Sequence, residues 1–392
     1  MPLPIPAVQR ALQEDGLDGW LLYDFHGSNP IAARLAGLAS GKMSTRRWYY
    51  LVPVTGTPRG LVHAIERHNL DGLPGETQPY SGREQLSSGL RDLLKGIRRV
   101  AMEYSPGNAI PYVSRVDAGT VEAVRELGIE VVSSGDLVQR FEALWTDEQL
   151  ATHQAASERL YRIKDRAFEL VKQRVGAGGA LTEFEVQQDM VRWFSEEGLV
   201  TDAPPIVAAQ ENAANPHYGP ARDSSRAIAR NEMLLLDLWG KLPAPGAVFA
   251  DITWVGYTGK SVPAPYATAF AAARDGRNAA IELVQASVKE RRVLRGYQVD
   301  RACRDVIDRA GFGAQFIHRT GHSLGQDVHG NGAHMDDYET HDDRRLIPGS
   351  GFTIEPGVYT GTFGVRTEIN MFVGEQEARV TGPLQQEIVT LA

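Results

Sequence analysis

The sequence predicts two domains of mixed helix and strand: an α/β domain over residues 1–144 and a larger α+β domain over residues 145–392. Before residue 144, short helix-like and strand-like stretches alternate, which is typical of α/β layers. Near residue 147 a long charged helix begins, and apolar strand-like runs with separate helices follow it. Strands grouped apart from helices are typical of α+β domains.

Within the smaller domain, an amphipathic stretch over 7–16 that ends at a glycine predicts a helix, and a second helix is predicted over 112–128. Short apolar runs bounded by turn-forming residues predict strands. These strands are expected at 19–25, 47–54, 60–65, 98–104 and 129–134.

The larger domain opens with the long charged helix. Thr146 followed by two acidic residues gives a helix-start signal, and the charged pattern continues to about residue 175. Further helices are expected at 183–197, 263–289 and 297–310. Apolar runs predict strands of an antiparallel sheet at 232–242, 248–259, 350–361 and 365–374.

The composition is that of an ordinary globular chain: 392 residues, 42% hydrophobic and 23% charged, with a formal net charge of −8. The acidic balance argues against nucleic acid as the main partner. A single cysteine, Cys303, excludes an intrachain disulfide and a cysteine-based zinc site, and its helix-like surroundings predict a buried thiol. We expect no signal peptide and no membrane span, and therefore a cytoplasmic location.

Four carboxylates stand in apolar, strand-like settings: Asp237, Asp251, Glu355 and Glu368. Any one of them could pair with an arginine, but four in separate strands favour a metal site, as do three histidines within 318–330 (HRTGHSLGQDVHG). Four carboxylates and one neutral imidazole balance the charge of two divalent cations. A ligand set rich in carboxylates and free of sulfur favours manganese, with cobalt, zinc and iron as alternatives.

The order Asp, Asp, His, Glu, Glu, with the motifs HxxGHSLGxDVHG, TIEPGVY and RTE, resembles the pita-bread metallopeptidases. That family includes methionine aminopeptidase, aminopeptidase P, prolidase and creatinase. The resemblance covers about residues 145–392 and implies a pita-bread fold for them. Residues 1–144 resemble the smaller α/β creatinase-type N-terminal domain through their general pattern and the segment GWLLYDFHGSNP, which points to the Xaa-Pro branch.

The resemblance also implies which residues hold the metals. Two divalent ions would be bound by Asp237, Asp251, His322, Glu355 and Glu368. Asp251 and Glu368 would bridge the two ions. Glu355 would also carry a proton from the bridging water to the leaving nitrogen.

Four further residues complete the implied site. His217 and His329 would contact the substrate carbonyl and stabilise the tetrahedral intermediate. His318 would line the substrate pocket, with core packing as the alternative. Arg366 is expected beside the substrate site as support for a carboxylate ligand, with a surface ion pair as the alternative.

The glycines of the histidine segment have a predicted purpose as well. Gly321, Gly325 and Gly330 are expected to let the backbone approach the metal site closely. The two histidines that follow, His334 and His341, are expected in solvated loops.

Two features depart from the family pattern. Asp237 and Asp251 lie 14 residues apart, so the hairpin between them is longer than usual. Val248 occupies a position where relatives of the Xaa-Pro branch often carry a tyrosine. These departures suggest a distinct subfamily.

The resemblance implies a homodimeric, dinuclear-metal Xaa-Pro dipeptidase (prolidase) that hydrolyses the bond before proline in dipeptides by a metal-bridging hydroxide. The alternatives are an Xaa-Pro aminopeptidase acting on longer peptides, a creatinase-type hydrolase, and a non-catalytic binding protein on the same scaffold. The complete ligand set disfavours the last two.

A dipeptidase also has to bind the carboxylate of proline, for which an arginine is suited. Arg46 or Arg47, which share the segment 40–50 with Lys42, is expected to reach into the neighbouring subunit as this clamp. Simple solvation of these side chains is the alternative.

Overall fold

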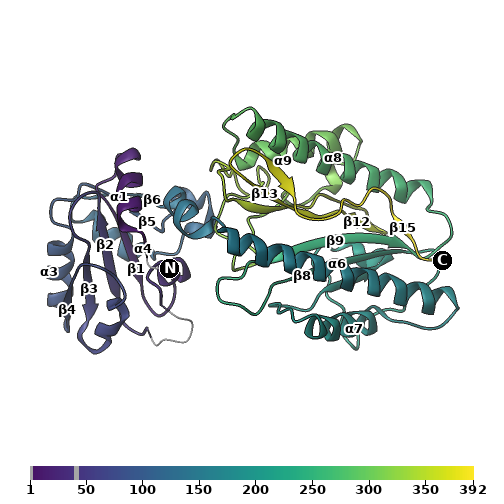
Figure 1. Cartoon of the computed structure of the whole chain (residues 1–392), viewed down its shortest axis with the longest axis horizontal. Helices are drawn as coiled ribbons and strands as arrows, with labels where there is room; N and C mark the ends of the chain where they lie inside the picture. Colours follow the sequence, from purple (N-terminus) through teal and green to yellow (C-terminus); the bar gives the residue numbers. More distant parts are fainter. Residues whose placement is uncertain (1–2, 39–43) are drawn as a thin grey trace. The chain divides into compact units, whose positions relative to one another are not determined.

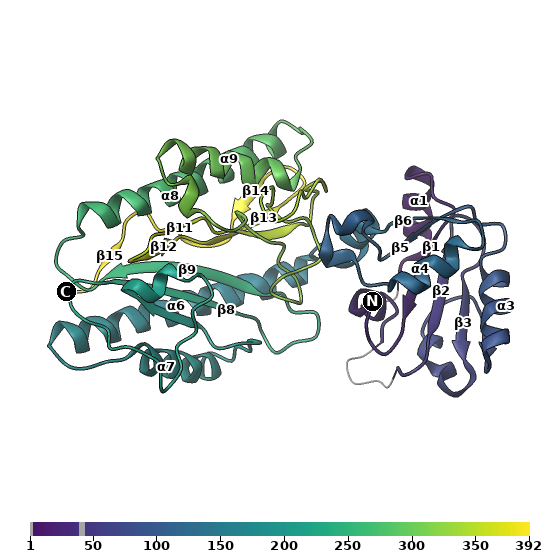
Figure 2. The same cartoon turned by 180° about the vertical axis from the view of Figure 1, so that it is seen from behind.

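The computed structural model describes residues 3–38 and 44–392. The chain divides into two compact units, Met1–Ala143 and Leu144–Ala392, and each has its own hydrophobic cores. Figure 1 labels their helices and strands, and Figure 2 gives the view from behind.

A six-stranded sheet forms the centre of the smaller unit, in the order β4-β3-β2-β1-β5-β6. Its strands are β1 (Gly19–Asp24), β2 (Trp48–Pro53), β3 (Arg59–His63), β4 (Glu76–Tyr80), β5 (Arg99–Met102) and β6 (Glu130–Ser133). Strand β2 runs antiparallel to β1 and β3, whereas the other neighbouring strands are parallel. The carboxyl ends of the five parallel-running strands and the amino end of β2 therefore share one edge of the sheet.

Helices cover both faces of this sheet: α1 (Ile5–Glu14), α2 (Pro30–Leu35), α3 (Arg83–Leu93), α4 (Ala118–Arg125) and α5 (Gly135–Val138). Trp20 and Leu22 of β1 pack in one core with α1, α2 and α5, whereas Leu21 and Tyr23 pack in a second core with α3 and α4. Successive side chains of a strand point to opposite faces, so β1 contributes to both cores.

The α/β character predicted for this unit is confirmed, and the five predicted strands are present within two residues at each end. The helix predicted over 112–128 begins only at Ala118, because the Asp117 side chain caps it by accepting a hydrogen bond from Thr120 N at 2.9 Å. Strand β4 and helix α3 were not predicted. Four of the five residues of β4 are exposed, so its sequence lacks the alternation that marks a half-buried strand.

The larger unit contains four long helices: α6 (Asp147–Gly176), α7 (Glu183–Glu196), α8 (Ala264–Lys289) and α9 (Gly296–Arg309). The sequence predicts all four within about one residue at each end. Thr146 forms a capping box, in which its side chain accepts from Gln149 N at 3.2 Å and its backbone N–H donates to Gln149 Oε1 at 3.0 Å. Among the residues described, no helix is long and apolar enough to cross a membrane.

The strands of the larger unit form three sheets. The first, β15-β9-β8-β7, contains β7 (Ile206–Ala209), β8 (Met233–Gly240), β9 (Ala250–Tyr257) and β15 (Val389–Thr390). The second sheet contains β10 (Gly351–Ile354), β13 (Ile369–Val373) and β14 (Ala378–Val380). The third pairs β11 (Gly357–Tyr359) with β12 (Gly364–Arg366). The expectation of a single antiparallel sheet is therefore wrong, and β15 runs parallel to β9.

Strands β8 and β9 lie between two hydrophobic cores (Figure 1). Leu234 and Leu236 pack on the side of α6 and α7, whereas Leu235 and Val255 pack on the side of α8 and α9. The hairpin is therefore covered on both faces. A polar side chain along it is costly to bury unless a hydrogen bond or an ion compensates for the lost water. Cys303 of α9 is buried, as predicted.

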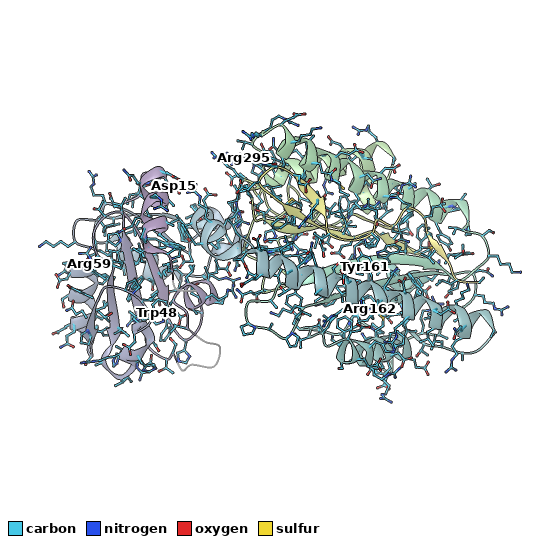
Figure 3. The ribbon with its side chains drawn as sticks, in the orientation of Figure 1. Asp15, Trp48, Arg59, Tyr161, Arg162 and Arg295 are labelled. Atoms are coloured by element: carbon cyan, nitrogen blue, oxygen red, sulfur yellow. The ribbon has the colours of Figure 1, made fainter. Side chains whose placement is uncertain are left out.

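Neighbouring residues of α6 show how this helix separates core from solvent (Figure 3). Tyr161 is buried, and its hydroxyl donates to Pro383 O at 3.1 Å. Arg162 is exposed and pairs with Glu197 at 2.6 Å.

His153 connects α6 to the strands beside it. The side chain is fully buried against Trp145, with the ring centroids 4.7 Å apart. Nδ1 lies 2.8 Å from Phe249 O and Nε2 lies 2.7 Å from Thr381 Oγ1. Burial lowers the pKa of His153 to about 4, so the ring is neutral at pH 7.

We expect His153 to lower the free energy of unfolding as the pH falls from about 6.5 to about 4. In that window the unfolded chain binds a proton at this residue and the native chain does not, which costs about 3 kcal/mol of stability in total. Denaturant titrations of the wild type and of His153→Gln measure the effect. The stability difference between the two proteins should change with pH, and a constant difference would contradict a neutral buried ring.

Candidate metal centre

The structure brings the five predicted metal ligands together in the larger unit. Asp237, Asp251, His322, Glu355 and Glu368 all line one cavity of about 410 Å³. Asp251, His322 and Glu368 each offer a ligand atom, and these three atoms lie within 4.8 Å of one another. His322 Nε2 is 3.3 Å from Glu355 Oε1 and 3.6 Å from Asp251 Oδ2.

The register of the β8–β9 hairpin sets the two aspartates. Asp237 is opposite Thr253, and Asp251 is opposite Trp239, so the aspartates form a diagonal pair on one face. Asn370 fixes the backbone of Asp251: its Oδ1 accepts from Asp251 N at 3.0 Å and its Nδ2 donates to Asp251 O at 2.6 Å. The positions of the carboxylates therefore follow from backbone pairing.

The two glutamates lie where the chain passes from one sheet to another. Glu355 separates β10 from β11, and Glu368 separates β12 from β13. Glu355 N donates to Thr320 O at 2.7 Å, and Glu368 N donates to Thr253 O at 3.1 Å. The expectation that both residues lie inside continuous strands is wrong, because each occupies a break between two short strands.

His322 reaches the carboxylates from a segment that runs beside β10. Its N–H donates to Thr353 Oγ1 at 2.9 Å, and its carbonyl accepts from Thr353 N at 2.8 Å. The ring Nδ1 lies 3.1 Å from Ser323 O, and a proton on Nδ1 would leave the Nε2 lone pair facing the carboxylates.

The glycines of this segment differ in how closely they are surrounded. A Cβ at Gly321 would lie 2.0 Å from Thr353 O, and one at Gly330 would lie 2.8 Å from Ser323 Oγ. A Cβ at Gly325 would have no atom nearer than 3.7 Å. Gly321 and Gly330 are therefore packed tightly against neighbouring atoms of the chain, whereas Gly325 is not. The expected approach of these glycines to bound metal stays a prediction from the sequence.

The electrostatics of the cavity favour a bound cation. Burial raises the pKa of Asp237 to about 6, and it raises the pKa values of Asp251 and Glu368 well above their usual range. Asp251 Oδ1 and Glu368 Oε1 are buried without a hydrogen-bond partner among the described residues. Buried anionic oxygens of this kind are costly unless a cation meets them, so the residues present fit divalent metal ions.

Arg366 belongs to the same polar network. Its guanidinium contacts Asp237, and it donates to Thr253 Oγ1 at 2.9 Å and to the Tyr359 hydroxyl at 3.1 Å. Thr253 Oγ1 in turn donates to Glu368 Oε2 at 2.7 Å. These contacts favour the expected support of a carboxylate over a surface ion pair, since Arg366 is only 4% exposed.

Two of the predicted non-ligand histidines line the cavity, His217 and His329. The His329 ring meets the His322 ring edge to face, with centroids 4.4 Å apart. The nearby His322 and burial lower the pKa of His329 to about 2, so this imidazole is neutral at pH 7 and carries one N–H for donation.

His318 is not among the residues that line the cavity. Its Nε2 lies 2.9 Å from the Tyr359 hydroxyl and its Nδ1 lies 2.7 Å from Arg319 O. Because Tyr359 contacts Arg366, His318 supports the network from behind the cavity, which corresponds to the packing alternative.

The expectation of a solvated His334 is wrong. His334 is fully buried, and its Nδ1 accepts from Ser323 N at 3.0 Å. His341 is exposed, as expected, and its Nδ1 lies 2.5 Å from Asp337 Oδ1.

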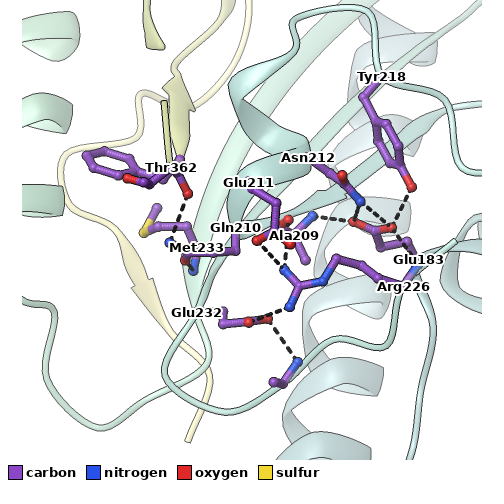
Figure 4. Close-up of polar contacts among 12 residues, drawn as sticks. Glu183, Ala209, Gln210, Glu211, Asn212, Tyr218, Arg226, Glu232, Met233 and Thr362 are labelled. Atoms are coloured by element: carbon purple, nitrogen blue, oxygen red, sulfur yellow. Dashed lines mark hydrogen bonds and ion pairs between the residues drawn. The ribbon is translucent and has the colours of Figure 1, made fainter. Parts of the chain in front are cut away.

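The loop that carries His217 is held by the buried Glu183, as Figure 4 shows. Glu183 accepts from Ala209 N at 2.7 Å, from Asn212 Nδ2 at 3.0 Å and from the Tyr218 hydroxyl at 2.6 Å. Tyr218 also lines the cavity. Neither Glu183 nor Tyr218 was predicted from the sequence, although Tyr218 directly follows His217 in the chain.

The lengthened hairpin does not enter the cavity. Val248 is fully buried and packs in a separate small core with Trp145 and Phe249. Its N–H donates to Thr152 Oγ1 of α6 at 3.3 Å. The departures from the family pattern therefore affect the outer end of the hairpin rather than the wall of the cavity.

Arg46 and Arg47 belong to the smaller unit, where both are exposed and line a different cavity. Lys42 lies outside the described residues.

Comparison with known proteins finds relatives in both sequence and structure. The sequence profile of metallopeptidase family M24 matches residues 153–375. The chain is 28% identical over 267 residues to the probable dipeptidase PepE of Mycobacterium tuberculosis, a match that covers 68% of this chain and 65% of that protein, just under two thirds. It is 29% identical over 232 residues to an Xaa-Pro dipeptidase of Lactobacillus helveticus, a match that covers 59% of this chain and 57% of that protein.

Among solved structures, the dipeptidase PepE of Mycobacterium ulcerans aligns with a TM-score of 0.74 at 21% identity, over 99% of this chain and 96% of that one. This likeness concerns the fold. With the family match, it confirms the predicted fold class, a pita-bread α+β domain preceded by a smaller α/β domain.

We expect the three buried carboxyls of the metal-free site to contribute less and less stability as the pH rises above about 4, a contribution opposite in sign to that of His153. The folded pKa values of Asp237, Asp251 and Glu368 lie above their unfolded values, so their protonated forms stabilise the fold at low pH and that contribution is lost as each group ionises. Added Mn²⁺ should restore the stability at pH 7.5.

Denaturant titrations after chelation measure this effect, with Asp251→Asn as the matched variant. Without metal at pH 7.5, the variant should be more stable than the wild type by about 1 kcal/mol or more, because one of the repelling charges is gone. It should also respond less to Mn²⁺. Equal stabilities of the two metal-free proteins at every pH would contradict the repulsion.

Proposed function

The chain belongs to metallopeptidase family M24, and on that premise we propose that it is a dinuclear-metal Xaa-Pro dipeptidase, or prolidase. The observation that carries the proposal is the convergence of three buried carboxylates, the partly buried Glu355 and one imidazole on a single cavity. Two relatives, an Xaa-Pro dipeptidase and a probable dipeptidase, support this substrate class. The family implies divalent metal ions, and the sulfur-free, carboxylate-rich set favours manganese.

The bond before proline is a tertiary amide without an N–H. A peptidase that binds its substrate through a hydrogen bond from that N–H therefore cannot bind this bond. Two divalent cations held by Asp237, Asp251, His322, Glu355 and Glu368 would supply Lewis-acid activation of the carbonyl and of a water molecule at neutral pH.

The chain's own residues then have separate tasks. Glu355 is oriented by Thr353 Oγ1, which donates to its Oε1 at 3.1 Å, and it would carry the proton of the attacking water to the proline nitrogen. His329 and His217 would donate hydrogen bonds to the carbonyl oxygen as negative charge develops there. Arg366 would hold Asp237 in place.

That the protein is a homodimer located in the cytoplasm remains our prediction from the sequence.

The first test is hydrolysis of Ala-Pro and Ala-Pro-Ala by the manganese-loaded protein, with a chelator as control. We expect cleavage of the dipeptide, little cleavage of the tripeptide and no activity with the chelator. Glu355→Gln should lower kcat about 10²- to 10⁴-fold, as expected for loss of a proton carrier. Equal cleavage of both peptides would instead indicate an aminopeptidase, and no cleavage of either by metal-loaded protein would overturn the proposal.

The same assay tests the proposed carboxylate clamp. If Arg46 or Arg47 binds the carboxylate of proline, its replacement by alanine should raise KM for Ala-Pro about 10-fold and leave kcat nearly unchanged. Arg91→Ala, an exposed arginine of the same unit, serves as the control. An unchanged KM in both variants would remove the clamp from the proposal.

One acidic residue of the cavity wall was not predicted and bears on the preferred first residue. Trp239 lies on the same face of β8 as Asp237, and its indole N–H donates to Asp202 Oδ1 at 2.6 Å. Asp202 and Trp239 both line the cavity. The tryptophan thus orients a carboxylate that could receive a cationic side chain of the substrate.

We therefore expect a preference for Lys-Pro over Leu-Pro, two dipeptides whose first side chains differ mainly in charge. Asp202→Asn should lower the ratio of the two kcat/KM values about 10-fold, the effect of one hydrogen-bonded charge pair. A ratio that is the same in wild type and variant would show that Asp202 does not read the first residue.

A further inference from the structure

The smaller unit contains a cavity of about 820 Å³ at the shared edge of its sheet. Phe25 follows the end of β1, Arg46 and Arg47 precede β2, and His63 and Tyr80 end β3 and β4. The first turns of α3 and α4 complete the wall. In open α/β sheets this carboxyl-end edge is where ligands generally bind, because the following helices begin there with their N–H groups directed at the opening.

The cavity is basic although the protein is acidic overall, with a net charge of −8. Arg46, Arg47 and Arg83 line it, and within residues 3–38 and 44–392 none of the three forms an ion pair with a carboxylate. Glu66 lies close to Arg46, whose backbone N–H donates to it at 3.1 Å. Arg47 and Arg83 therefore carry most of the uncompensated charge.

One carboxylate lines this cavity, and it is already engaged. Asp117 caps α4, accepting from Thr120 N at 2.9 Å and from Thr120 Oγ1 at 2.8 Å. At the other helix, the N-cap residue Gly82 provides no side-chain hydrogen bond to the first turn of α3. The N–H groups of that turn are thus not covered by a capping side chain, beside the Arg83 guanidinium.

Neutral donors and aromatic rings complete the wall. Burial raises the pKa of Tyr23 to about 12, so its hydroxyl stays protonated at neutral pH. The Tyr80 hydroxyl donates to Arg47 O at 2.8 Å and holds the backbone of that arginine at the cavity. Phe25 is 43% exposed and offers a ring face at the rim.

We propose that this cavity binds a phosphate-bearing small molecule with more than one negative charge, such as a nucleoside diphosphate. Two or three guanidinium groups match several phosphate oxygens, whereas a single carboxylate would engage only one of them in a forked pair. A volume of about 820 Å³ is within the range of small-molecule sites and large enough for a base or sugar beside the phosphates. The site goes beyond the proposed peptidase activity. It shares Arg46 and Arg47 with the proposed carboxylate clamp, so its test uses Arg83, which the clamp does not involve.

The test is isothermal titration calorimetry of the full chain with ADP and with inorganic pyrophosphate, at low and at moderate salt. We expect binding that weakens with salt, and a loss of affinity of about 10-fold in Arg83→Ala. Arg91→Ala, on the same helix but away from the cavity, should bind as the wild type does. Because no peptidase assay is involved, failure of this proposal and failure of the proposed activity are distinguishable.

Hydrogen exchange provides a second measurement that needs no variant. ADP or pyrophosphate should protect the amides of 81–86 and 117–121, the first turns of α3 and α4. Three results would each overturn the proposal. They are no binding of either probe, an equal loss of affinity in Arg83→Ala and Arg91→Ala, and protection confined to the metal-site segments of the larger unit. Equal binding of the two probes would support it and assign the affinity to the phosphates.

Discussion

Repulsion among buried carboxylates is the constraint on which the larger unit depends. Asp237, Asp251 and Glu368 are buried side by side at one cavity, where ionised oxygens are poorly solvated, and one guanidinium cannot neutralise them all. The chain holds them together through backbone geometry: the hairpin register sets the aspartates, and Asn370 clasps the backbone of Asp251. The geometry needed for a cation is therefore part of the fold itself.

The sequence alone predicts many of the helices and the metal-ligand candidates, because their signals lie in short stretches of the chain. The helices α7, α8 and α9 follow from short-range periodicity and capping, and their ends agree with expectation within about one residue. The metal-ligand candidates stood out because Asp237 and Asp251 interrupt apolar runs that have no other reason to contain a charge. The family match then confirmed the fold class that the motifs had implied.

Other features depend on partners that are distant in the chain. Glu355 and Glu368 mark breaks between strands, since their neighbours pair with different sheets, and a run of apolar letters does not show where pairing changes. His334 is buried because it receives the N–H of Ser323, a contact without any local signal. The basic cavity of the smaller unit likewise joins residues of six elements, among them β4 and α3, which the sequence did not predict.

The space around the missing Cβ atoms of the glycines near His322 decides which of these positions can accept a side chain in a mutagenesis library. At Gly321 any side chain would collide with the carbonyl of Thr353, so randomising this codon would yield almost only misfolded clones. At Gly325 the space around the missing Cβ is open. A library around His322 can therefore diversify position 325 and leave 321 untouched, although both glycines belong to one motif.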